Sequence, residues 1–99
     1  GDEPRHIPLA DILFFEAAPK AHHVYLHTAD SRLDFVGSLN ELEKELDGRF
    51  VRVHRSFLAA WDKIEAVDGK GNQVRVGGRM CLLSRTGKAE LKKKLRGNF

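Results

Sequence analysis

The sequence is poor in cysteine, proline and tryptophan, and it contains no long hydrophobic run. A single cysteine, Cys81, excludes an internal disulfide and suits a reducing compartment, so we expect a cytoplasmic protein. No apolar stretch approaches the roughly 20 residues that a membrane-spanning helix needs, and no N-terminal segment has the residue order of a secretory signal peptide. Three prolines, no repeat and no low-complexity tract predict a single domain over residues 1–99 without a membrane partner.

The charges are divided unevenly along the chain. Leucine, isoleucine, valine and phenylalanine make up 28 of the 99 residues, which is enough for a folded core. Residues 1–48 hold four basic and ten acidic side chains, a net charge of −6, whereas residues 49–99 hold thirteen and four, a net charge of +9. This asymmetry indicates an anionic partner for the second half. A solvated surface that is merely uneven is the alternative.

The apolar pattern predicts many short strands joined by tight turns. Residues 24–28 and 33–36 alternate and are separated by a turn, which is typical of a hairpin. Residues 12–16 are either a buried strand or a helical turn, and residues 54–64 lack alternation, so a helical turn is expected there. Hairpins favour antiparallel sheets over βαβ units. Further strands are predicted at residues 50–54, 64–67, 73–76 and 80–83.

Two helices are expected beside these strands. Ser38 and Glu41 form a capping box before a stripe of leucines, and Gly48 ends that short amphipathic helix. Ser84 is the candidate N-cap of a second, basic helix over Arg85–Arg96. The predicted fold class is therefore mainly β, with one short amphipathic helix and a C-terminal basic helix.

The residue pattern does not support metal or enzyme chemistry. His23 and His27 lie on or beside a strand, where four residues span about 13 Å, too far for one zinc ion. Ser56 lies in no Gly-x-Ser-x-Gly elbow, and Gly69–Gly71 lacks the third glycine of a dinucleotide-binding loop. We therefore expect no metal, no cofactor and no catalysis, and we expect Cys81 to be a buried thiol.

Three basic loops remain as candidates for binding an anion. Arg49 and Arg52 lead into Arg55, and Arg85 lies just inside a helix start, where backbone N–H groups attract phosphate. Arginine is also the side chain best suited to read guanine in a major groove. Residues 20–23 form a third basic loop, which includes His22.

The order of these segments resembles the LytTR domain, the DNA-binding module of LytR/Agr-type bacterial response regulators. The most specific stretch is FVRVHRSF at residues 50–57, and the similarity runs from about residue 7 to residue 95. Ala60 stands where the family usually has asparagine. The other stretches that carry the resemblance are DILFFE at 11–16, KAH at 20–22, GSLNELEKEL at 37–46, DKI at 62–64 and LSR at 83–85.

The resemblance implies an elongated fold of stacked antiparallel sheets whose loops, rather than a recognition helix, enter the grooves of double-stranded promoter DNA. It implies direct repeats in bent DNA, with one domain per repeat and a possible dimer on the DNA. It also implies a longer parent chain with an N-terminal receiver domain in a two-component phosphorelay, quorum sensing included. Base readout is expected from His22, Arg55 and Arg85, and phosphate or supporting contacts from Lys20, His23, His54, Arg79, Thr86 and Lys88.

An alternative function is an RNA-binding or protein-docking β module that uses the same basic face. The sequence lacks the aromatic-rich strand motifs that stack single-stranded bases, and its eight aromatic residues lie mostly at apolar-patterned positions. Competition between duplex DNA and single-stranded RNA distinguishes these two functions.

Overall fold

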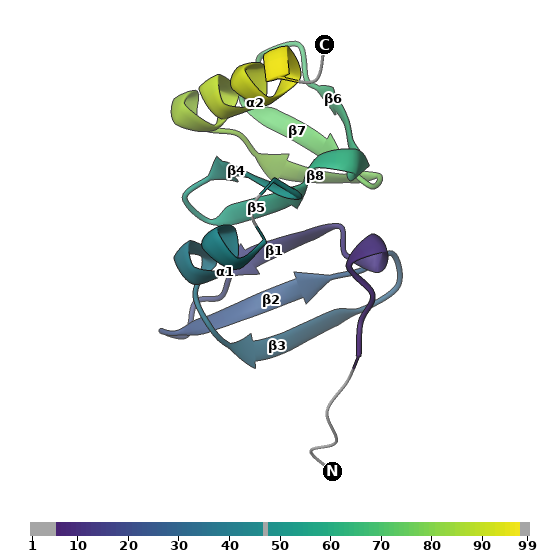
Figure 1. The fold of residues 1–99 in the computed structure, drawn as a ribbon, viewed down its shortest axis with the longest axis vertical. Coiled ribbons are helices and arrows are strands. Elements are labelled where there is room, and N and C mark those ends of the chain that lie inside the picture. Colours follow the sequence, from purple (N-terminus) through teal and green to yellow (C-terminus); the bar gives the residue numbers. More distant parts are fainter. Residues whose placement is uncertain (1–5, 47, 98–99) are drawn as a thin grey trace.

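The structure is a computed structural model that describes residues 6–46 and 48–97. It is elongated, with extents of 43 × 27 × 25 Å, and it consists of two antiparallel sheets stacked along the long axis (Figure 1). The five strands of the first sheet have the order β3-β2-β1-β5-β4, and the three of the second have the order β6-β7-β8. The predicted fold class is therefore confirmed.

The elements follow the predicted boundaries closely, and the hairpin of residues 24–28 and 33–36 is confirmed as β2 and β3. The first sheet contains β1 (Phe14–Ala17), β2 (His23–His27), β3 (Arg32–Val36), β4 (Phe50–His54) and β5 (Phe57–Ala60). The second sheet contains β6 (Ile64–Val67), β7 (Gln73–Val76) and β8 (Arg79–Leu82). The helices are α1 (Leu39–Glu45) and α2 (Arg85–Gly97), with 3₁₀ turns η1 (Leu9–Asp11) and η2 (Trp61–Lys63).

Strand β1 is buried on both of its faces. Phe14 belongs to a core that includes side chains of β4, β7, β8 and α2, whereas Phe15 belongs to a second core that includes Leu39 of α1. Neighbouring residues of a strand point to opposite faces, so each phenylalanine packs into a different core. The apolar run that could be a strand or a helical turn is therefore a strand with two buried faces.

The helical turn expected within residues 54–64 is wrong for Phe57–Ala60. These residues form β5, which pairs with both β1 and β4. Leu58, Ala59 and Ala60 are all buried, because β5 lies between the two cores. A strand buried on both faces has no polar alternation, which is the signal that sequence interpretation uses. The helical turn itself exists, but it is confined to Trp61–Lys63.

Both predicted helix caps are present. The Ser38 hydroxyl accepts a hydrogen bond from the Glu41 backbone N–H at 3.2 Å, and the Ser84 hydroxyl accepts one from the Gly87 N–H at 2.9 Å. Helix α1 ends at Glu45, three residues before the predicted Gly48, although Gly48 has the expected positive φ, +83°. Within residues 6–46 and 48–97, no helix is long and apolar enough to span a membrane.

Helix α2 begins in close contact with the end of β4. The Ser84 backbone N–H donates to the Val53 carbonyl at 2.9 Å, and Gly87 lies so near this strand that an added Cβ would be 1.9 Å from the same carbonyl oxygen. Only a residue without a side chain allows this approach. The contact brings the start of α2 beside the turn that follows β4.

Candidate nucleic-acid interface

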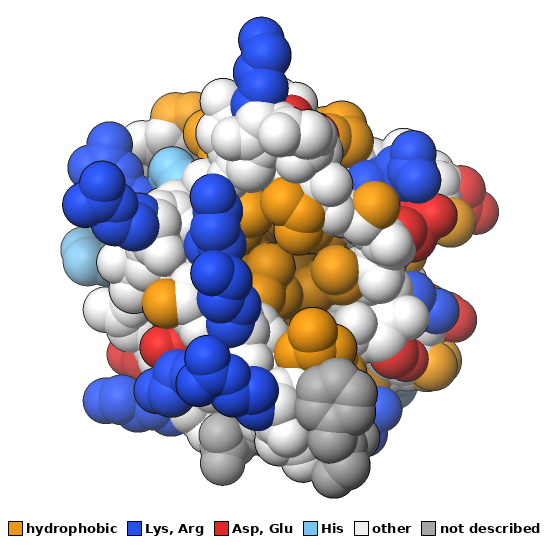
Figure 2. Space-filling model, turned by 90° about the horizontal axis from the view of Figure 1, so that it is seen from above, with side chains coloured by type: hydrophobic (Ala, Val, Ile, Leu, Met, Phe, Trp, Pro, Cys, Tyr) orange, Lys and Arg blue, Asp and Glu red, His pale blue; other side chains and the backbone are white. Residues whose placement is uncertain are grey.

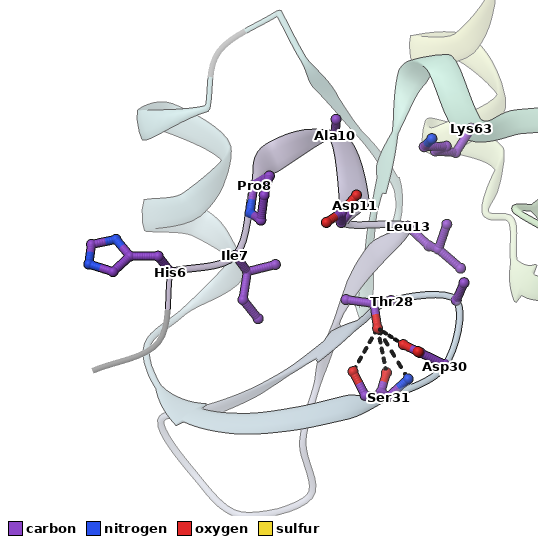
Figure 3. A pocket seen from close by; sticks show the side chains of 11 residues that line it. His6, Ile7, Pro8, Ala10, Asp11, Leu13, Thr28, Asp30, Ser31 and Lys63 are labelled. Atoms are coloured by element: carbon purple, nitrogen blue, oxygen red, sulfur yellow. Dashed lines mark hydrogen bonds between the residues drawn. The ribbon is translucent and has the colours of Figure 1, made fainter. Parts of the chain in front are cut away.

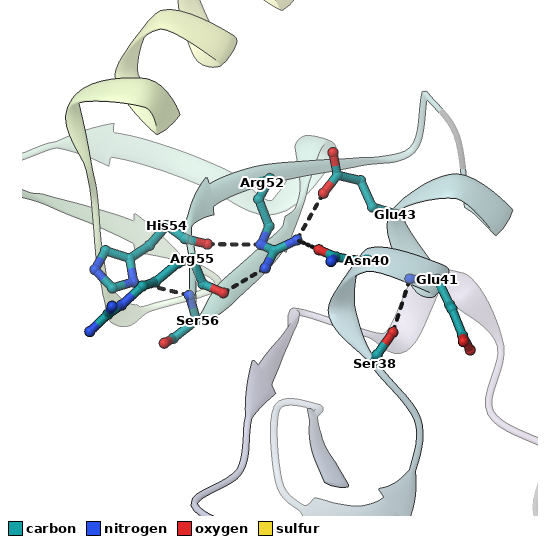
Figure 4. Close-up of polar contacts among 8 residues, drawn as sticks. All are labelled: Ser38, Asn40, Glu41, Glu43, Arg52, His54, Arg55 and Ser56. Atoms are coloured by element: carbon teal, nitrogen blue, oxygen red, sulfur yellow. Dashed lines mark hydrogen bonds and ion pairs between the residues drawn. The ribbon is translucent and has the colours of Figure 1, made fainter. Parts of the chain in front are cut away.

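The turn between β4 and β5 presents Arg55 to solvent and is tied to its surroundings by hydrogen bonds. Its backbone is linked to β1, because the Ser56 carbonyl accepts from the Ala17 N–H at 2.9 Å. The guanidinium of Arg52 binds the turn from inside: Nε donates to the His54 carbonyl at 3.0 Å, and Nη2 donates to the Arg55 carbonyl at 2.6 Å (Figure 4). The turn is therefore held on both sides while the Arg55 side chain stays exposed.

The same guanidinium connects the turn to α1. Nη1 of Arg52 donates to Asn40 Oδ1 at 2.8 Å and to Glu43 Oε1 at 3.0 Å (Figure 4). Sequence reasoning groups Arg52 with the basic residues but misses this role. One signal in the sequence could have revealed this role. Arg52 lies in an apolar strand between Val51 and Val53, both buried, and a charged side chain on such a strand needs polar partners.

His54 offers a defined donor at the edge of this turn. Its Nδ1 accepts a hydrogen bond from the Ser56 backbone N–H at 3.1 Å, which assigns the proton to Nε2 in the neutral ring. Burial lowers the pKa of His54 below its ordinary value, and the charges of Arg55 and Arg52 lower it further. At neutral pH the ring is therefore uncharged, with an Nε2–H group available as a donor.

The loop between β1 and β2 carries His22 in an unusual backbone conformation. His22 has a φ of +64°, and its carbonyl accepts from the Gly37 N–H at 2.9 Å. Lys20 and His22 are exposed, whereas His23 is half-buried and its Nδ1 lies 2.8 Å from Asp34 Oδ1. A left-handed histidine costs roughly 1 kcal/mol, so the surrounding backbone hydrogen bonds hold the loop in this conformation.

These loops meet on one face. A hollow of about 220 Å³ is lined by Lys20, His22 and Arg55, and an adjoining hollow of about 430 Å³ is lined by His54, Arg55 and Thr86. Both hollows include Arg52 and Arg55, so the β4–β5 turn lies between the His22 loop and the start of α2. Arg85 is exposed between Ser84 and Thr86, both of which line the second hollow. We call Lys20, His22, His54, Arg55, Arg85 and Thr86 the loop face.

Arg79 and Lys88 are not brought to the loop face. Arg79 starts β8, about 10 Å of strand away from the end that leads to α2. Its guanidinium lies 3.0 Å from His27 Nδ1 and donates to the Ala29 carbonyl at 3.3 Å, which joins the second sheet to the first. Lys88 lines an apolar hollow with Trp61 and Leu91. Their expected phosphate contacts stay predictions, but they lie apart from the other candidates.

The hollow near η1 and the β2–β3 turn has a mixed lining, in which Lys63 is the only lysine or arginine among the described residues. It has a volume of about 540 Å³, and Asp11 and Asp30 contribute to its lining (Figure 3). The Thr28 hydroxyl is engaged there with Asp30 and Ser31. No group of three or more metal-ligating side chains occurs in the part of the chain that the structure describes. Glu43 and Glu90 also line the second hollow of the loop face, but the loop face carries three exposed cations, Lys20, Arg55 and Arg85, and is therefore the candidate site for an anion.

Comparison with known proteins identifies the family. The sequence model of the protein family described as the LytTr DNA-binding domain matches residues 2–96. The chain belongs to the LytTR family of DNA-binding domains. This LytTR domain is 37% identical over 70 residues to accessory gene regulator protein A of Staphylococcus aureus (strain N315) and of Staphylococcus epidermidis (strain ATCC 35984). The match covers 71% of this chain and 29% of each relative, so the chain spans less than a third of their length.

A solved structure shows the same fold. The LytTr DNA-binding domain of a putative methyl-accepting/DNA response regulator from Bacillus cereus superposes with a TM-score of 0.75 at 23% identity. The match covers 90% of this chain and 84% of that one. This match confirms the fold, and the family model confirms the resemblance to the LytTR family and the DNA-binding class. The roles of single residues are predictions.

Proposed function

We propose that this LytTR domain binds promoter double-stranded DNA in a sequence-specific manner as the effector domain of a bacterial response regulator. The observation that carries the proposal is the loop face, where three loops far apart in the sequence meet around Arg55. Its cations suit the phosphate backbone, and its projecting loops suit the grooves. The domain acts by binding and carries out no chemical step.

The roles within the loop face follow from exposure and donor geometry. Arg55 and Arg85 are exposed arginines that reach guanine edges, and His22 provides an exposed imidazole beside them. Lys20, Thr86 and the first backbone N–H groups of α2 hold phosphates, and His54 adds its Nε2–H donor. His23 supports the loop through the contact between its Nδ1 and Asp34 Oδ1 on the neighbouring strand β3.

We infer that the parent protein is a longer regulator with a receiver domain in a two-component phosphorelay. The matched relatives are named accessory gene regulator proteins, and this domain spans 29% of their length. Such a regulator acts on promoter DNA in the cytoplasm, with one domain on each direct repeat and a possible dimer on the DNA.

Selection of binding sites from a random duplex pool tests the proposal. We expect an enriched duplex motif, and competition with single-stranded RNA of equal length should leave the complex intact. RNA that competes as well as the selected duplex would support the RNA-binding alternative. A pool without an enriched motif would refute sequence-specific binding.

A further inference from the structure

Arg52 directs almost all of its guanidinium donors into the protein. Its Nε, Nη1 and Nη2 atoms each donate to protein oxygen atoms, at distances from 2.6 to 3.0 Å. The side chain is 22% exposed, and its charge is paired with Glu43. A guanidinium that is occupied in this way has little capacity left for a phosphate.

The partners of Arg52 come from two elements that contribute to the site. The carbonyls of His54 and Arg55 belong to the β4–β5 turn, and Asn40 and Glu43 belong to α1. Asn40 also lines the hollow beside His22. The planar fork of arginine reaches all four oxygens at once, whereas a lysine ammonium is a point charge without that geometry.

We propose that Arg52 is the positioning residue for sequence readout: it sets the direction of Arg55 and the spacing of that turn from the His22 loop, and it does not contact DNA. This proposal rests on the proposed function. If it is correct, loss of Arg52 lowers specificity and leaves the number of phosphate contacts unchanged.

A double-mutant cycle tests this role. Arg52→Gln and Arg55→Ala are made singly and together, and each is titrated with the selected duplex and with a random duplex over a series of salt concentrations. We expect Arg52→Gln to weaken binding to the selected duplex by about tenfold or more, with the salt slope unchanged. In the Arg55→Ala background it should cost clearly less than in the wild type, because only the part of its effect that acts through the spacing of the His22 loop remains.

The controls separate positioning from a general loss of charge and from direct contact with DNA. Arg75→Gln removes the same charge from a half-exposed pair with Glu65 on β7 and should leave the selected duplex bound as before. Arg52→Lys keeps the charge, yet we expect it to restore little of the specificity. A salt slope that falls by about 0.9 in Arg52→Gln, or losses that add fully with Arg55→Ala, would show a phosphate contact and overturn the proposal. If Arg55→Ala itself binds the selected duplex normally, the proposed function fails instead.

A second surface stands apart from the loop face. Figure 2 shows an apolar hollow with lysine and arginine side chains along one edge. This apolar groove has a volume of about 560 Å³ and is lined by Trp61, Ile64, Val67, Leu91 and Leu95. Lys88 and Lys92 complete its charged edge, and Lys94 Nζ lies 5.8 Å from the centre of the Trp61 ring.

The charge and the apolar lining together indicate the kind of partner. Among the residues that the structure describes at the groove, the charged ones are lysines and none is acidic. Phosphates do not fill an apolar hollow, whereas leucine-type side chains do. We propose that this groove docks an acidic amphipathic segment of a partner protein, with apolar side chains against Trp61 and carboxylates beside Lys88 and Lys92. This proposal does not depend on DNA binding.

Trp61 is the single tryptophan of the chain, so its fluorescence reports directly on the groove. The probe is a synthetic helix of about four turns with leucines on one face and glutamates on the other, and its twin carries lysines in place of glutamates. We expect saturable binding and a blue shift with the acidic peptide alone. Leu95→Asp should weaken binding by about tenfold or more, and Lys92→Glu by about two- to fivefold.

Lys93→Glu is the matched control, because Lys93 is on the same helix, does not line the groove and is 74% exposed. Its affinity should stay close to that of the wild type. Equal binding of the two peptides, or equal effects of Lys92→Glu and Lys93→Glu, would overturn the proposal. Competition by duplex DNA would also overturn it, because DNA would then occupy the groove. A shift of the Trp61 fluorescence with protein concentration alone would indicate a second copy of the chain in the groove, and a shift on removal of residues 98–99 would indicate the end of the chain. Either result would overturn the proposal.

Discussion

Replacement of Gly87 by alanine should destabilise this domain, although Gly87 lies inside a helix. Helix propensity alone favours alanine over glycine by about 1 kcal/mol. In the folded protein, however, an added Cβ would lie 1.9 Å from the Val53 carbonyl oxygen, 2.4 Å from its carbon and 2.8 Å from its Cα. These are backbone atoms of a strand in the core, so the helix has to move instead.

The cost of this movement can be worked from the contacts that it breaks. Overpacking costs roughly 1–3 kcal/mol, and loss of the 2.9 Å hydrogen bond from Ser84 to Val53 costs about 1 kcal/mol more. After the gain in helix propensity, we expect a net loss of about 1–3 kcal/mol. For a domain of this size that lowers the melting temperature by roughly 4–24 °C.

Thermal and urea unfolding followed by circular dichroism measure this effect. Gly97→Ala is the control, because Gly97 lies in the same helix and an added Cβ there meets no atom of the described residues within 4 Å. Its stability should equal that of the wild type or exceed it by up to about 1 kcal/mol, the gain in helix propensity. If Gly87→Ala is as stable as the wild type or more stable, the close approach of α2 to β4 is wrong.

Three further outcomes are expected. Burial lowers the pKa of His27 below 6.5, so the unfolded chain binds more protons under slightly acidic conditions. The contribution of neutral His27 to the free energy of unfolding is then fully present above pH 6.5 and is lost on acidification. Urea unfolding at several pH values measures this slope, and His27→Gln should flatten it. Arg85→Ala should lose about 1–3 kcal/mol on the selected duplex and relax its specificity, and unchanged binding in a gel-shift series would contradict its reading role. Burial raises the pKa of the Cys81 thiol to about 12, so thiol reagents at pH 8 should react with it in urea and not in the native protein.

Local patterns explain why so much of the fold is predictable from the sequence. Alternation in β2 and β3, glycine turns between the strands of the second sheet, and the serine caps of both helices act over a few residues. Their signals therefore survive in the sequence without knowledge of distant partners. The motif FVRVHRSF likewise contains both the β4 strand and its turn in one continuous stretch.

Features that depend on distant neighbours are not predictable in this way. Strand β5 carries no alternation because both of its faces are covered by other elements. Arg79 appears as one more exposed cation in the sequence, yet its guanidinium lies against His27, 52 residues away. Lys88 is one helical turn from Arg85, but its side chain lines the apolar groove.

The sequence by itself determined the family, the anionic partner and the three basic loops, because each is encoded in residues that are neighbours along the chain. Only the tertiary structure decided that those loops form one face, that Arg52 donates to the Arg55 carbonyl, and that a side chain at Gly87 would collide with Val53. These features arise from backbones that approach each other from far apart in the sequence. Their hydrogen bonds and steric limits depend on ångström-scale distances between elements, which no local pattern records.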